Sequence, residues 1–120
     1  MKGLVVGGAL VVAWAGFVVH NFADLAGQTL LSPETLYPSL GYVAIAALWV
    51  ARARRTGGWV ALGWGGLQLV GGAIISVLPL SFLPFGPEQT VRHYLFHVLY
   101  GVAQVPLLVV AWRATRRTGE

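Results

Sequence analysis

The sequence predicts an all-α integral membrane protein, a single antiparallel bundle of four transmembrane helices with both termini in the cytoplasm. Apolar residues make up 57% of the 120 residues and charged residues only 10%, whereas soluble domains carry roughly 25% charged residues. Four stretches have the roughly 20 largely apolar residues that a helix needs to cross a bilayer. The few charged residues lie mainly between these stretches. The lipid bilayer is therefore the expected surrounding of most of the chain, which has the length of one domain.

The four expected helices follow one another with short connections. The first contains no charged residue. Lys2 and the small residues near Ala13 give it some likeness to a signal peptide, but its apolar run continues through Val19, too far for the apolar region of a cleaved leader. We therefore expect this segment to stay as a membrane span. The helices are expected at residues 4–22, 33–51, 59–80 and 87–112.

Helix starts and kinks are marked by proline. The Ser-Pro-Glu sequence at 32–34 combines an N-cap residue, a first-turn proline and an acidic residue, which is typical of a helix start. The Gly-Pro-Glu sequence at 86–88 predicts a second such start. Pro38 and Pro106 lie inside the second and fourth expected helices, where they predict kinks.

The basic residues predict the orientation. Seven of the eight would lie on one side of the membrane, and only Arg92 on the other. Because cytoplasmic segments carry the excess of Lys and Arg, that side is expected to be the cytoplasm and the membrane a bacterial plasma (inner) membrane. The net charge of +4 does not indicate nucleic acid, since the basic residues flank apolar stretches. The seven are Lys2, Arg52, Arg54, Arg55, Arg113, Arg116 and Arg117.

Several chemistries are excluded by composition. The chain has no cysteine, which excludes disulfides, thiol redox chemistry, cysteine-ligated zinc and iron–sulfur clusters. No Asp or Glu lies in the middle of an expected helix, which argues against a proton-coupled drug exporter, and no nucleophile-elbow or phosphate-loop motif is present. The three histidines are the main remaining candidates for chemistry.

Two of these histidines are predicted to lie at the same depth. With a rise of 1.5 Å per residue, His20 lies about 24 Å and His97 about 22 Å above the inner boundary. The first and last helices of an up-down-up-down bundle are neighbours. Asp24 and His93 lie one turn higher, each four residues from one of the pair. His20, Asp24, His93 and His97 therefore form a predicted site for zinc, copper or iron.

Haem b is an alternative cofactor for the same place. His20 and His97 would be its axial ligands, Gly16 and Gly101 would leave room for the macrocycle, and Tyr100 would donate a hydrogen bond from below. A purely interfacial role, in which the polar groups simply end the helices at the headgroups, also explains them. A proton relay or a site for an organic ligand stays open as well.

The fourth helix carries a polar face. His93, His97, Tyr100 and Gln104 follow i, i+4, i+7, i+11 spacing and so share one side, which lipid cannot satisfy. Gln104 is predicted to be level with Gln68 of the third helix. We expect both amides in the bundle interior, hydrogen-bonded to each other between the helices.

The leading functional hypothesis is a small accessory or ligand-binding membrane protein. Its polar pocket on the extracytoplasmic side would hold a metal, haem or a small apolar ligand. One alternative is an oligomeric transporter or channel with a pore lined by Gln68, Gln104 and Tyr100. Another is a membrane enzyme with His97 as base. A homo-oligomer or a larger membrane complex is the expected assembly for a subunit of this kind.

Overall fold

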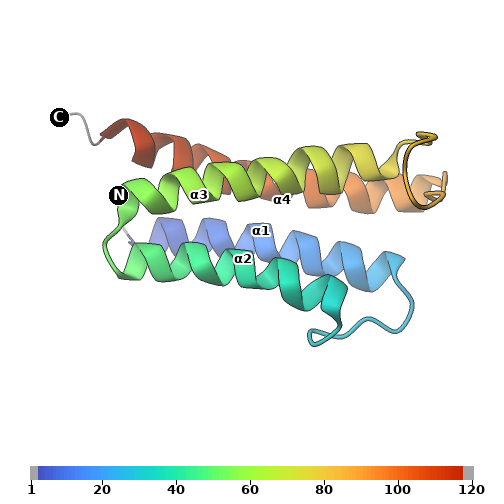
Figure 1. Cartoon of the computed structure of the whole chain (residues 1–120), viewed down its shortest axis with the longest axis horizontal. Coiled ribbons are helices and arrows are strands. Elements are labelled where there is room, and N and C mark those ends of the chain that lie inside the picture. The colour runs from blue at the N-terminus through green and yellow to red at the C-terminus, as the bar shows by residue number, and fades with distance from the viewer. Residues whose placement is uncertain (1–2, 118–120) are drawn as a thin grey trace.

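The chain folds into four antiparallel helical rods, as Figure 1 shows for the computed structural model. The structure describes residues 3–117, and all regular elements within that range are helical. Both α1 and α3 run in one direction along the long axis, and α2 and α4 run back (Figure 1). The elements are α1 (Gly3–Asp24), α2 (Pro33–Val50), α3 (Arg54–Leu67), the π-helix η1 (Gln68–Ile74), the short 3-10 helix η2 (Ile75–Val77) and α4 (Val91–Arg116).

Three of the rods are long and apolar enough to cross a membrane. They are α1 with 22 residues, the continuous helix Arg54–Val77 with 24, and α4 with 26. The 18 residues of α2 include Pro33, Glu34 and Pro38, so its mean hydropathy is lower. The molecule is 47 Å long, which matches a bilayer of about 40–45 Å including its headgroups.

The third and fourth helices extend farther toward the arginine-rich end than the sequence indicated. The third begins at Arg54 rather than at 59, and the fourth ends at Arg116 rather than at 112. The two ends pack on each other: a Cβ at Gly58 would lie 3.1 Å from Cγ2 of Thr115 and 3.3 Å from Cβ of Ala114. Gly58 permits this close packing of the two helices. The third helix therefore continues through it instead of beginning after it.

The start expected at 86–88 is wrong. The fourth helix begins at Val91, and its N-cap is Thr90, whose Oγ1 accepts a hydrogen bond from the backbone N–H of His93 at 3.2 Å. Residues 86–88 lie in the connection that precedes it. The third helical rod likewise ends at Val77 rather than at 80, before the proline at position 79.

The start of α2 is at Pro33, with Ser32 as N-cap, as expected. The Ser32 carbonyl accepts hydrogen bonds from the backbone N–H groups of Thr35 and Leu36 at 3.0 and 2.7 Å. Its hydroxyl serves the preceding loop instead, where it accepts from the N–H of Thr29 at 2.9 Å. The cap therefore ties the loop 25–32 to the helix.

The centre of the bundle is α4, which packs most extensively against α1 and then against α3. Close approach is set by small residues. A Cβ at Gly16 of α1 would overlap the Cβ of Ala103 of α4, and one at Gly72 of η1 would overlap the Tyr100 hydroxyl. The buried apolar core includes Val6, Ala9, Leu10, Phe17, Tyr42, Ile45, Ala61, Leu107, Val110 and Ala111.

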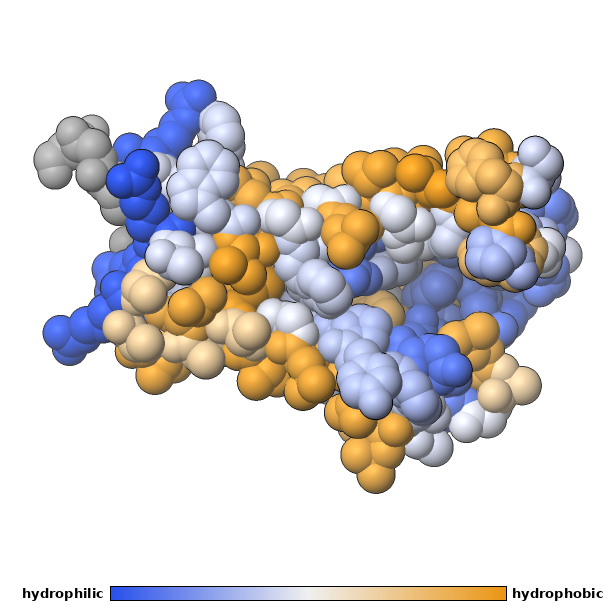
Figure 2. Space-filling model, viewed as in Figure 1, coloured by the Kyte–Doolittle hydropathy of each residue, from blue (hydrophilic) through white to orange (hydrophobic). Residues whose placement is uncertain are grey.

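The two ends of the molecule differ chemically. Large apolar side chains are exposed along all four rods. Hydrophilic side chains project at the end where α1 begins, on the left of Figure 2, and this end carries exposed arginines. The opposite end is hollowed, and hydrophilic atoms line the recess (Figure 2). The exposed arginines are Arg52, Arg54, Arg55, Arg113, Arg116 and Arg117.

Candidate functional site

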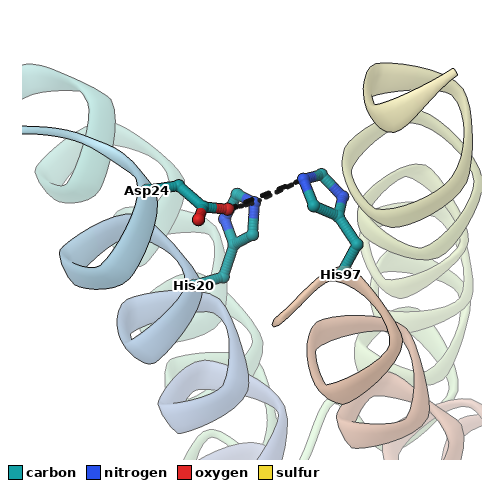
Figure 3. Close-up of side chains that lie close together, drawn as sticks. All are labelled: His20, Asp24 and His97. Carbon is teal, nitrogen blue, oxygen red and sulfur yellow. Dashed lines mark hydrogen bonds and ion pairs between the residues drawn. The ribbon is translucent and has the colours of Figure 1, made fainter. Parts of the chain in front are cut away.

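Three side chains converge at the hollowed end of the bundle. His20 and Asp24 project from the last turns of α1, and His97 projects toward them from α4 (Figure 3). The Nε2 atoms of the two histidines are 2.9 Å apart. Oδ2 of Asp24 lies 3.1 Å from Nε2 of His20 and 3.7 Å from Nε2 of His97. The structure thus brings together three of the four residues predicted for a metal site, with donor atoms all within 4.8 Å of one another.

The tautomer of His97 follows from its second nitrogen. Nδ1 lies 2.9 Å from the backbone carbonyl oxygen of Ala73 in η1. A carbonyl oxygen only accepts hydrogen bonds, so Nδ1 must carry the proton. In the neutral ring, Nε2 then presents a lone pair toward Asp24 and His20.

The tautomer of His20 is fixed in the same way through Asn21. The Nδ2 group of Asn21 donates to the Glu34 carbonyl at 3.0 Å and to Oγ1 of Thr35 at 3.1 Å. This orients the amide with its oxygen toward His20, whose Nδ1 lies 3.1 Å from it and must donate. Nε2 of the neutral His20 ring therefore also presents a lone pair to the centre of the cluster.

The groups that face the centre of the cluster are therefore all hydrogen-bond acceptors, with no hydrogen-bond donor among them. Two imidazole lone pairs and a carboxylate oxygen face one another, and the Asp24 side chain is only 4% exposed. Its two oxygens are buried and have no hydrogen-bond partner within residues 3–117. A buried carboxylate in this condition is costly. A cation between the three groups, either a metal ion or a proton on one imidazole, relieves it.

The separations suit a tetrahedral metal ion. Zinc binds imidazole nitrogen and carboxylate oxygen at about 2.0–2.2 Å, which places neighbouring donors about 3.3 Å apart in a tetrahedron. The observed separations of 2.9, 3.1 and 3.7 Å lie around that value. Two histidines and a carboxylate are also a ligand set that zinc commonly takes.

The fourth predicted ligand, His93, borders this trio from one turn nearer the start of α4. Its Nδ1 lies 3.3 Å from Oδ2 of Asp24, and its ring centroid is 4.5 Å from that of His97. Nδ1 is buried and has no hydrogen-bond partner within the described part of the chain. His93 therefore reaches the cluster through Asp24.

A cavity of about 460 Å³ opens above the cluster. All four predicted ligands contribute to its wall, so the converging atoms border a space that water and ions can enter. The remaining wall comes from the end of the third helical rod and from the connection before α4, namely Ser76, Phe85, Gly86, Pro87 and Glu88, with Leu25 beyond α1.

The two glycines that were expected to leave room for haem are in contact with neighbouring helices. Gly16 packs on Ala103, and a Cβ at Gly101 would lie 3.2 Å from Cδ1 of Leu69 and 3.3 Å from Cβ of Ala73. The rings of His20 and His97 meet edge to face, with centroids 4.3 Å apart and planes at 84°. This packing favours a single ion over a macrocycle between the two helices.

Tyr100 supports the cluster from below. Its ring stacks on His20 with centroids 4.9 Å apart and planes at 29°, and its hydroxyl donates to Oε1 of Gln68. Gln104 has a separate set of partners: Oε1 accepts from the Tyr42 hydroxyl at 2.7 Å, and Nε2 donates to the Ala13 carbonyl at 2.9 Å. Both amides are buried, but each pairs with a tyrosine instead of with the other amide.

Sequence reasoning gave Asn21 only a place at the headgroup end of the first helix and missed Thr35; both hold His20 in place. Asn21 is 5% exposed and Thr35 is fully buried. The available signal was the position of Asn21 directly after His20 in an otherwise apolar helix, a place where a polar side chain needs a partner.

Comparison with known proteins gives no match: no family model, curated protein or solved structure is similar to this chain.

Proposed function

We propose that this chain is a four-span membrane protein that binds one divalent transition-metal ion, with zinc as the reference ion, through His20, Asp24 and His97. The observation that carries the proposal is the convergence of two imidazole lone pairs and a buried carboxylate oxygen within 4.8 Å. Both remaining ring nitrogens are engaged with acceptors, which is how metal-ligating histidines are usually held. The role is accessory and non-catalytic, the binding of a metal at one membrane face.

The arrangement in the membrane is part of the proposal. At 1.5 Å per residue the 18 residues of α2 extend about 27 Å, close to the roughly 30 Å of a hydrocarbon core, so α2 is the fourth span. The arginine-rich end faces the cytoplasm, since cytoplasmic segments carry the basic excess. The metal site then lies on the extracytoplasmic side of a plasma membrane.

Metal content of the purified protein tests this proposal. The full chain in mild detergent should bind a single zinc ion, measured by elemental analysis and by competition with a chromophoric chelator. His20→Ala, His97→Ala and Asp24→Asn should each weaken zinc binding by about 100-fold or more, because each removes a ligand. Glu34→Gln is the matched control, since Glu34 is an exposed carboxylate near the same end, and it should bind zinc as the wild type does.

Two results would contradict the proposal. One is a wild-type protein that binds no zinc, copper or iron at micromolar concentrations. The other is a set of ligand variants that retain the wild-type affinity. A Soret absorption band in protein from haem-supplied cells, if it is lost in His20→Ala, would show that this site binds haem and not a single metal ion.

A further inference from the structure

The trio supplies three ligands, whereas a tetrahedral ion takes four. We propose that the fourth coordination position faces the outer cavity and takes a small exogenous anion or water, with His93 as its hydrogen-bonding partner and not as a metal ligand. This inference rests on the proposed metal site. It assigns to the cavity a ligand class, small anions such as hydroxide or azide.

The position of His93 is the first argument. The donor atoms of His20, Asp24 and His97 form one group within 4.8 Å, while His93 approaches that group by its Nδ1 at 3.3 Å from Oδ2 of Asp24. This Nδ1 is buried and has no hydrogen-bond partner within residues 3–117. It is therefore a free polar atom beside the ion, placed to bond a molecule that the ion holds.

Charge is the second argument. A divalent ion bound to one carboxylate and two neutral imidazoles retains a net charge of one positive unit. Asp24 is nearly fully buried, and an uncompensated charge in such a site is costly. An anion in the fourth position makes the centre neutral.

The cavity is the third argument. Its volume of about 460 Å³ is many times the roughly 30 Å³ that one water molecule occupies in the liquid. The second carboxylate on its wall, Glu88, is exposed and accepts a hydrogen bond from the Thr90 hydroxyl at 2.9 Å. Glu88 thus already has a hydrogen-bond donor in Thr90, which leaves the space next to the ion for an external ligand.

Cobalt(II) substitution tests the proposal on the wild-type protein. Cobalt replaces zinc in tetrahedral sites, and its visible absorption reports its ligands. Azide should change the spectrum in a saturable manner with the cobalt still bound. In His93→Ala, the protein should retain its cobalt and bind azide about fivefold more weakly, the factor that one ordinary hydrogen bond contributes.

The opposite result identifies a closed site. The inference would be overturned if azide left the wild-type spectrum unchanged but altered the spectrum of His93→Ala or of Glu88→Gln. The side chain replaced in the responding variant would then be the fourth ligand. A spectrum that ignores azide in all three proteins would overturn it as well. In both cases the cobalt is bound, so the proposed metal site stands. If cobalt and zinc do not bind at all, the metal site itself fails.

Discussion

Replacing Gly72 by alanine should destabilise the bundle beneath the candidate site, because η1 and α4 meet there without space for a methyl group. A Cβ at Gly72 would lie 2.8 and 2.9 Å from Cε1 and Cζ of Tyr100 and would overlap its hydroxyl. The ring cannot move away easily. It is 2% exposed and lies between His20, with centroids 4.9 Å apart, and Phe17, at 5.8 Å.

The expected cost is the sum of two effects. Overpacking of a core typically costs about 1–3 kcal/mol. Displacement of the Tyr100 hydroxyl from Gln68 loses a further hydrogen bond of about 0.5–1.5 kcal/mol. We therefore expect Gly72→Ala to lower the free energy of unfolding by about 1.5–4.5 kcal/mol.

The neighbouring glycine provides the control. A Cβ at Gly71 would meet only Cδ1 of Leu67, at an ordinary 3.5 Å. Gly71→Ala should therefore leave stability unchanged or raise it slightly, since alanine is the better helix former. Both free energies can be measured by denaturant unfolding in detergent micelles, followed by circular dichroism. Equal stability of the two variants would refute the reasoning from Tyr100.

Three further predictions follow from the packing and from the site. Gly16→Ala should lower the thermal unfolding midpoint, because its methyl group would overlap Cβ of Ala103. Gly8→Ala should leave the midpoint unchanged, since a Cβ there meets no atom within 4 Å. Equal midpoints of the two proteins in a thermal scan would exclude a tight α1–α4 contact. Asn21 is not a ligand but the hydrogen-bond partner of the ligand His20. Asn21→Ala should therefore weaken zinc binding about 10–100-fold, as loss of such a partner commonly does. Unchanged zinc affinity in chelator competition would show that His20 is held by other means. Free zinc at 100 times its dissociation constant should raise the free energy of unfolding by about 2.7 kcal/mol. This gain in stability should vanish when a chelator is added, and it should be absent in His97→Ala. A gain that persists in His97→Ala would place the ion elsewhere.

The number and order of the helices could be read from the sequence because apolar runs determine them locally. The ends of the third and fourth helices differ from the expected ones by three to five residues. The equal depth of His20 and His97 followed from a constant rise per residue. What could not be read is the rotation of each helix about its axis. Gln68 and Gln104 were expected to bond because they are level, but their partners are Tyr100 and Tyr42.

Glycine was ambiguous for a related reason. A missing side chain can leave room for a cofactor or allow a neighbouring helix to come closer, and the sequence is the same in both cases. At Gly16 the space is taken by Ala103. At the start of α4, the proline at position 87 gave a stronger local signal than Thr90, yet the threonine hydroxyl is the group that accepts the backbone hydrogen bond of His93.

The apolar core between the candidate site and the arginine-rich end restricts access to the site to one end of the bundle. An ion that left His20 and His97 toward the arginine-rich end would have to pass between closely packed aliphatic side chains such as Leu10, Leu107 and Val110, which cannot replace its water of hydration. At the other end, His20 and His97 line the cavity of about 460 Å³ directly. In the proposed membrane arrangement, an ion held here would equilibrate with one compartment only. Its occupancy would then record the metal concentration of that compartment, regardless of the concentration across the membrane.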